Sequence, residues 1–238
     1  MNNIKDYEGG NMTQIQTREF FKQVYTYMAL ALGISGVIAF YCGTPDFFAK
    51  YLLNSAGTGL SPIFWVIAFA PLGLGLVIQM AYLKLSMGAL TALFVAYSVL
   101  MGLSLSSVFL IYSTGSIAST FLITAGAFAG MAILGFTTKV DLTKMGSLLY
   151  MVFIGMFIAG IVNIWMKSDF MGYIISILGV FVFTGLIAYE MQNLKHIAQE
   201  PGFDGMTKQK LALVGGLKLY ILFVNLFLSL LRLFGSRD

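Results

Sequence analysis

Charged residues are scarce in this sequence, and so are the residue types that usually build catalytic and metal sites. Only 10% of its 238 residues are Asp, Glu, Lys or Arg, whereas a soluble domain carries about 25%. The chain has one histidine, His196, and one cysteine, Cys42. A single cysteine excludes an internal disulfide and a cysteine metal cluster. Because no His, Asp or Glu pair has ligand spacing within an apolar segment, we expect no metal site and no cofactor.

Hydrophobic residues, in contrast, make up 58% of the chain, which predicts an integral membrane protein in contact with lipids. The net charge of +4 comes from lysines spread over loops rather than from a basic patch, so we expect no nucleic-acid partner. The first 20 residues are polar. They predict a cytoplasmic tail in place of a cleavable signal peptide.

Seven apolar segments are each near the roughly 20 residues needed to cross a bilayer. Their apolar runs are continuous rather than alternating, which favours helices over strands. The sequence therefore predicts an all-α membrane protein whose residues 1–238 form one domain of seven transmembrane helices. The segments are residues 24–42, 63–82, 87–111, 117–136, 145–166, 171–194 and 211–233.

Local motifs predict how several of these helices begin, bend and pack. Ser61 and Pro62 have the pattern of an N-cap followed by a first-turn proline. Pro71 should kink the second helix and free a backbone carbonyl that a neighbouring helix must satisfy. Gly126 and Gly130 form a GxxxG pair, which favours a close helix approach. Residues 195–205 form the longest polar loop, and their Pro-Gly pair predicts a turn.

The distribution of lysine and arginine predicts the orientation in the membrane, because cytoplasmic loops carry an excess of both. With the N-terminus inside, nine of the 14 lysines and arginines fall in inner segments and four in outer ones, with Lys218 unassigned. We therefore expect a cytoplasmic N-terminus and an external C-terminus. The inner residues are Lys5, Arg18, Lys22, Lys84, Lys139, Lys144, Lys195, Lys208 and Lys210; the outer are Lys50, Lys167, Arg232 and Arg237.

Two enzyme-like or cofactor-binding interpretations fail on missing partners. A lysine in the seventh helix is typical of a retinal Schiff base, but the third segment has no acid to act as its counter-ion. Gly102 and Ser104 resemble the serine motif of intramembrane proteases, but His196 lies in a polar loop, too far to act as the base. We therefore expect no catalytic residues, and helix packing explains Ser104 most simply.

The last segment carries a polar stripe within an apolar helix. Lys218, Leu222, Asn225 and Ser229 recur at i, i+4, i+7 and i+11, so they share one helix face. A second charge, Glu190, lies near the end of the preceding segment. Charged residues inside membranes are costly and mark functional sites unless they reach the interface. For both residues, a position at the membrane interface remains an alternative. However, Glu190 and Lys218 lie at similar depth, which predicts an ion pair between them. Gly215 and Gly216 would let the two helices approach closely.

Residues 185–192 (GLIAYEMQ) and 219–228 (LYILFVNLFL) resemble the signature of the Bax inhibitor, or transmembrane Bax inhibitor motif, family. Further similarity lies at residues 102–106, at residues 137–143 and at Asn163, and the bacterial branch is most similar. The resemblance implies seven helices with the seventh central in the bundle. It also implies a calcium leak gated by an acid pair on the sixth and seventh helices. For bacterial members it further implies restraint of a membrane-anchored protease.

This sequence departs from that pattern at the second acid. Glu190 supplies the acid of the sixth helix, whereas Leu222 occupies the position of the acid on the seventh. Two carboxylates can chelate calcium or share a proton, but a carboxylate and a lysine can do neither. Two functions follow: a calcium or proton leak with altered gating at Glu190, Lys218, Leu222 and Asn225, or a non-conducting regulator of a membrane partner such as that protease.

Overall fold

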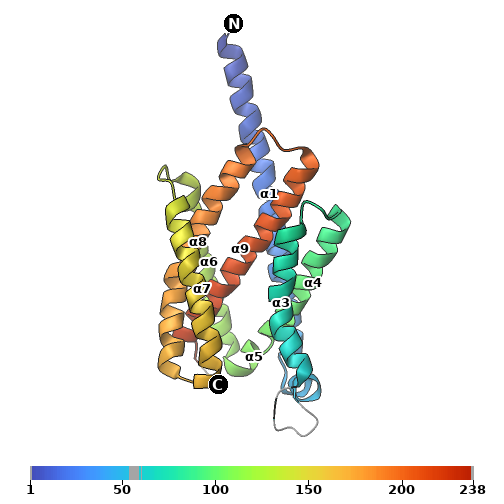
Figure 1. Ribbon diagram of the computed structural model, residues 1–238, viewed down its shortest axis with the longest axis vertical. Coiled ribbons are helices and arrows are strands. Elements are labelled where there is room, and N and C mark those ends of the chain that lie inside the picture. The colour runs from blue at the N-terminus through green and yellow to red at the C-terminus, as the bar shows by residue number, and fades with distance from the viewer. Residues whose placement is uncertain (1, 54–58, 60, 237–238) are drawn as a thin grey trace. The chain divides into compact units, whose positions relative to one another are not determined.

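A computed structural model describes residues 2–53, 59 and 61–236, with side chains described from residue 14 onward. Lys5 and Arg237, which the topology prediction counts, lie outside the described side chains. Helices account for nearly all of the described chain (Figure 1). They are α1 (Asn2–Cys42), α2 (Pro45–Phe47), the π-helix η1 (Phe48–Leu52), α3 (Pro62–Ala81), α4 (Met87–Leu105), α5 (Val108–Ile111), α6 (Thr114–Thr137), α7 (Thr143–Met166), α8 (Asp169–Gln199) and α9 (Gly205–Phe234).

Seven stretches in the described residues are long and apolar enough to cross a membrane, which confirms the predicted class. The last one is the most buried: 72% of its apolar window is covered, against 11–39% in the other six. This burial agrees with a central seventh helix. The spans are Gln14–Cys42, Pro62–Ala81, Met87–Ile111, Thr114–Thr137, Thr143–Met166, Asp169–Gln199 and Gly205–Phe234.

The chain divides into two compact units, so the single domain predicted for residues 1–238 stays a prediction. The first contains residues 1–113 and 201–217, and the second contains residues 114–200 and 218–236, with the last two residues grouped with the first. In the first unit, α4 packs against both α1 and α3. In the second unit, α8 packs against both α6 and α7.

Pro71 lies inside α3 and has no N–H to donate to the carbonyl of Ile67, one turn earlier. The hydroxyl of Ser104 on α4 donates to this carbonyl at 2.8 Å. The prediction that a neighbouring helix satisfies the freed carbonyl is confirmed, and so is a packing role for Ser104. The predicted start is also confirmed, because Ser61 caps α3 by accepting from the N–H of Phe64 at 3.3 Å.

The predicted close approach at Gly126 and Gly130 is wrong in position. Gly126 and Gly130 are exposed, and a Cβ on either would meet no atom within 4 Å. On the same helix it is Gly135 whose missing side chain lets the backbone of α8 approach, at Ala188. Gly216 does permit a close approach, but to α1 and not to the helix of Glu190: a Cβ there would lie 2.6 Å from the carbonyl oxygen of Val24.

The sixth span continues into what the sequence predicts as a loop. α8 ends at Gln199, so Lys195 and His196 lie on a helix and only residues 200–204 connect it to α9. Leu194 and Ala198 are buried, and the ammonium group of Lys195 donates to the carbonyl of Phe136 at 2.8 Å. These contacts stabilise a further turn of helix over residues 195–199, before Pro201. The predicted turn at Pro201 and Gly202 is confirmed.

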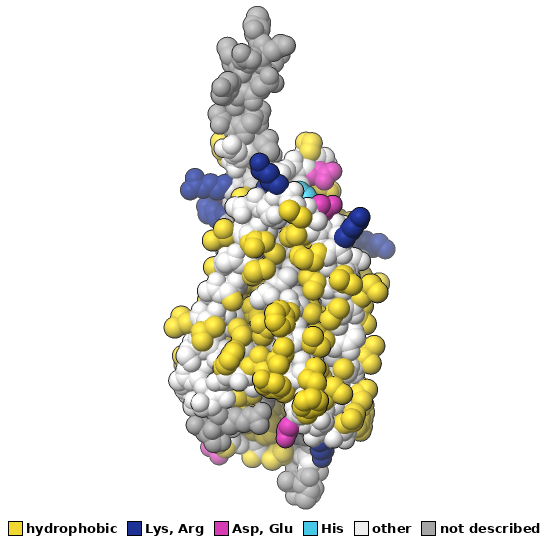
Figure 2. All heavy atoms as spheres, turned by 90° about the vertical axis from the view of Figure 1, so that its left-hand side faces the viewer, with side chains coloured by type: hydrophobic (Ala, Val, Ile, Leu, Met, Phe, Trp, Pro, Cys, Tyr) yellow, Lys and Arg dark blue, Asp and Glu magenta, His cyan; other side chains and the backbone are white. Residues whose placement is uncertain are grey.

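Charged side chains are confined to the ends of the face that Figure 2 shows, and hydrophobic side chains cover its middle. The exposed apolar side chains include Leu148, Met151 and Ile158 of α7 and Phe181 of α8. A surface of this kind is the one expected of helices that face lipid.

Candidate functional site: a buried ion pair on α8 and α9

Glu190 on α8 and Lys218 on α9 form an ion pair. The ammonium nitrogen of Lys218 lies 3.0 Å from Oε1 of Glu190. The Glu190 side chain is 1% exposed and that of Lys218 is 30% exposed. The predicted ion pair is therefore confirmed, and neither side chain takes the alternative position in which it reaches out to lipid headgroups.

The polar stripe of α9 faces α8, because a second contact repeats the register of the ion pair. Gly179 of α8 lies against the side chain of Ser229, so closely that a Cβ at position 179 would overlap it. Gly179 precedes Glu190 by 190 − 179 = 11 residues, and Ser229 follows Lys218 by 229 − 218 = 11. The equal spacing in opposite directions means that the two helices run antiparallel along this face.

The pair lies deeper than the sequence suggests. Glu190 is nine residues before the end of α8 and Lys218 is 13 residues after the start of α9. At about 1.5 Å per residue, these positions are roughly 14 Å and 20 Å from the helix ends. The predicted spans end at residue 194 and begin again at residue 211, so they omit the last turn of α8 and the first turn of α9 and place both charges too close to the loop.

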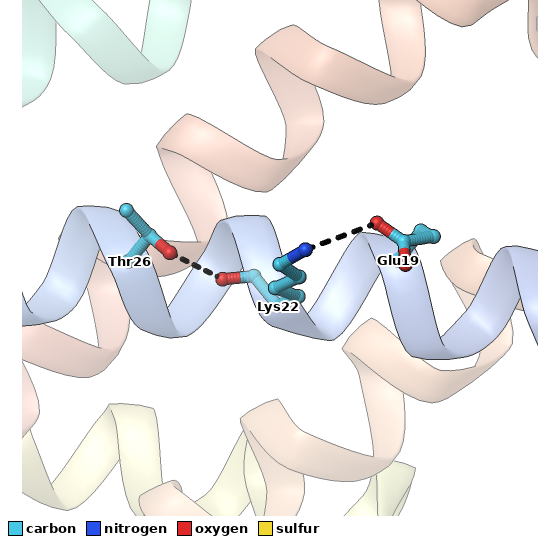
Figure 3. Close-up of polar contacts among 3 residues, drawn as sticks. All are labelled: Glu19, Lys22 and Thr26. Atoms are coloured by element: carbon cyan, nitrogen blue, oxygen red, sulfur yellow. Dashed lines mark hydrogen bonds and ion pairs between the residues drawn. The ribbon is translucent and has the colours of Figure 1, made fainter.

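An exposed ion pair on α1 provides a contrast (Figure 3). Lys22 lies 3.9 Å from Glu19, and their side chains are 73% and 58% exposed. Water screens such a surface pair, so it contributes little to stability. The buried charge of Glu190 depends much more on its partner, because removing one member of a buried pair leaves an uncompensated charge.

Gln192 lies on α8, two residues after Glu190, and binds the loop that joins α6 to α7. Its amide nitrogen donates to the carbonyl of Val140, and its amide oxygen accepts from the N–H of Leu142, both at 2.8 Å. Gln192 has no predicted role of its own. An amide inside an apolar run is the available signal, because a buried side chain with both a donor and an acceptor requires polar partners.

The remaining predicted site residues lie further along α9. Leu222 is buried and has no atom that can ligate a cation. Asn225 donates from its amide to the carbonyl of Ile221 at 2.8 Å and lines a cavity with Ser229 and Arg232. In the described part of the chain, no three His, Cys, Asp or Glu residues form a group that could hold a metal ion. Whether these residues gate an ion path stays a prediction.

Comparison with known proteins identifies the family. Residues 17–238 match the family model described as inhibitor of apoptosis-promoting Bax1. The chain is 39% identical over 220 residues to the inner membrane protein YbhL of Escherichia coli K12, covering 92% of each chain. It is 43% identical over 219 residues to an uncharacterised protein of Borreliella burgdorferi, again covering 92% of each. The signature residues, the seven spans and these matches agree: the chain belongs to the Bax inhibitor family and is a multi-pass inner-membrane protein.

Proposed function

We propose that this protein is a membrane leak for calcium ions or protons whose resting state is held closed by the Glu190–Lys218 ion pair. The proposal rests on one observation: Glu190 is almost completely buried, with the ammonium group of Lys218 at 3.0 Å. Acids inside membrane-spanning helices are costly, and they mark ion and proton pathways. In this proposal Glu190 is the acid of that pathway.

The pair closes the pathway because the ammonium group of Lys218 takes the position beside Glu190 that a permeant cation would need. A permeant cation must displace Lys218 before it can contact Glu190. Separating two charges in a poorly solvated site costs several kcal/mol per uncompensated ion. The leak through the resting protein is therefore slow, and its gating differs from that of an acid pair.

A second candidate is a regulator that binds a membrane-anchored protease and conducts nothing. Leu222 supports it: this buried, apolar residue occupies the place of the second acid, so the site lacks the ligands that a calcium pathway uses. The two proposals differ in whether the purified protein alone moves ions.

Ion flux into proteoliposomes distinguishes them. We expect slow uptake of calcium or protons by the wild type, and uptake several-fold faster with Lys218→Met, which frees Glu190. Glu190→Gln removes the acid of the pathway, which is also the counter-charge of Lys218, and should abolish the uptake. Glu19→Gln, which removes the exposed acid of α1, is the matched control and should behave as the wild type. Background flux in every variant, with the protein correctly reconstituted, contradicts the leak and favours the regulator.

A further inference from the structure

A cavity of about 210 Å³ lies among α7, α8 and α9, at the end where α7 finishes and α8 begins. Its apolar wall includes Phe153, Phe157 and Ile175. Its polar lining consists of Ser176, Asn225, Ser229 and Arg232. Among the described residues that line the cavity, Arg232 is the only cation and none is an acid.

The serine and asparagine side chains that line the cavity donate hydrogen bonds to backbone carbonyls of their own helices. Ser176 donates to the carbonyl of Gly172, and Ser229 donates to the carbonyl of Asn225, each at 2.8 Å. Asn225 likewise donates to Ile221. The hydroxyl hydrogens of Ser176 and Ser229 and one amide hydrogen of Asn225 are thus used within the helices, and Arg232 is the charged group of the lining that can bind a ligand.

Two donors meet near the start of α8, over Gly172. A Cβ on Gly172 would lie 3.9 Å from Nη1 of Arg232 and 3.6 Å from the amide nitrogen of Asn163. The amide oxygen of Asn163 already accepts from the N–H of Ser168 at 3.1 Å, which orients the amide nitrogen. Within the described residues Arg232 forms no ion pair, although Asp169 lies in the first turn of α8. A guanidinium beside an amide donor suits a phosphate or carboxylate.

The surroundings indicate that the anion belongs to a lipid. Trp165, Phe170 and Tyr173, near the same helix ends, are 76%, 74% and 55% exposed. Exposed aromatic side chains at the ends of membrane-spanning helices mark the level of the lipid headgroups. The cavity is also smaller than the roughly 300–1,000 Å³ of pockets for drug-sized ligands. It has room for part of an acyl chain rather than for a whole soluble ligand.

We propose that this cavity binds one anionic phospholipid. Arg232 and the amide of Asn163 hold the phosphate, and an acyl chain lies along Phe153 and Phe157. The net positive charge of the site favours a lipid with net negative charge over a zwitterionic one. This site is separate from the Glu190–Lys218 pair, and the proposal holds whether or not the protein conducts ions.

Native mass spectrometry of the purified, delipidated protein tests it, with phosphatidylglycerol, phosphatidylcholine and glycerol phosphate as probes. We expect phosphatidylglycerol to bind most tightly, and Arg232→Gln to weaken it about tenfold, the effect of losing one charge-assisted hydrogen bond. Lys167→Gln is the matched control, because it removes a positive charge from the same end without altering the cavity lining. It should leave the affinity within about twofold of the wild type.

Three results would overturn the proposal. Equal loss of binding in Arg232→Gln and Lys167→Gln would show a general attraction between charges at this end. Glycerol phosphate binding as tightly as the lipid would show a site for soluble anions. Phosphatidylglycerol binding unchanged by Arg232→Gln, in a variant that unfolds at the wild-type temperature, would place the lipid elsewhere or leave the cavity to water.

Discussion

Asp204 shows how one carboxylate controls the start of α9. Its Oδ1 accepts from the N–H of Thr207 at 2.9 Å. Hydrogen bonds from the side chain and the backbone of Thr207 lower the pKa of Asp204 below its usual 3.8. A carboxylate that is hydrogen-bonded in the folded state stabilises it above the pKa of the unfolded chain. The contribution is lost as the pH falls through the folded pKa.

We therefore expect the first turn of α9 to loosen only in acid. Amide hydrogen exchange at Thr207 and Lys208 should stay slow, after correction for the intrinsic rate, from neutral pH down to about pH 4 and accelerate below it. Asp204→Ala should give fast exchange throughout this range. Protection of the wild type that persists unchanged below the folded pKa would mean that the carboxylate does not stabilise this turn.

At the scale of helices, the contact between Ser104 and Ile67 joins α4 to α3. Ser104→Ala leaves the carbonyl of Ile67 without its partner, and an unsatisfied buried carbonyl costs about 1–3 kcal/mol. We expect Ser104→Ala to lower the free energy of unfolding by an amount near the lower end of that range. Ser107→Ala is the control: its hydroxyl donates to the backbone carbonyl of Ser104, three residues earlier, and its loss should cost less.

Pro71 leaves the carbonyl of Ile67 free for Ser104, so a change at Pro71 also tests this contact. Pro71→Ala restores an N–H that can donate to Ile67, so Ser104→Ala should cost less in that background than in the wild type. Chemical denaturation in mixed micelles measures both costs. Equal costs in the two backgrounds would show that Ser104 acts independently of the proline.

Sequence patterns predict the helices better than they predict which helix faces meet. The seven spans and the carbonyl freed by Pro71 follow from chain-local rules of hydropathy and backbone geometry. Gly126 and Gly130 have the spacing of a packing motif, but spacing does not determine which face of α6 meets a neighbour. Similarly, the polar residues after Leu194 predict a loop, because the contact from Lys195 to Phe136 that stabilises the helix joins residues 59 positions apart.

The candidate site divides in the same way. The ion pair was predictable, because Glu190 and Lys218 are costly in a membrane and their segments are adjacent in the chain. The lining of the cavity near Arg232 was not, since it combines residues of three helices that the sequence alone does not place together. Leu222 was recognisable only by comparison with a family pattern, because an apolar residue in an apolar helix gives no signal of its own.

At the scale of the whole molecule, the orientation in the membrane is predicted by the lysine and arginine bias. Seven spans with the N-terminus inside place the C-terminus outside. A C-terminal alkaline phosphatase fusion, active only outside the cytoplasm, should therefore be active. A green fluorescent protein fused at the same position should be dark, and the two fusions should give the opposite results when joined after Gly202. A fluorescent C-terminal fusion would contradict the orientation.

We infer that Glu190 and Lys218 stabilise each other as a clasp between α8 and α9. A double-mutant cycle on the free energy of unfolding tests it most directly, with Glu190→Gln, Lys218→Met and both changes together. Lys218→Met should cost the most, about 3 kcal/mol, because Glu190 has almost no access to water. Glu190→Gln should cost less, because Lys218 is 30% exposed and stays partly solvated.

We predict that the double variant costs at least about 1 kcal/mol less than the sum of the two single changes. The exposed pair on α1 is the control: Glu19→Gln and Lys22→Met should be additive within about 0.5 kcal/mol. If the costs at Glu190 and Lys218 are additive to the same degree, the two residues do not act as a clasp, and the proposed closed state loses its basis.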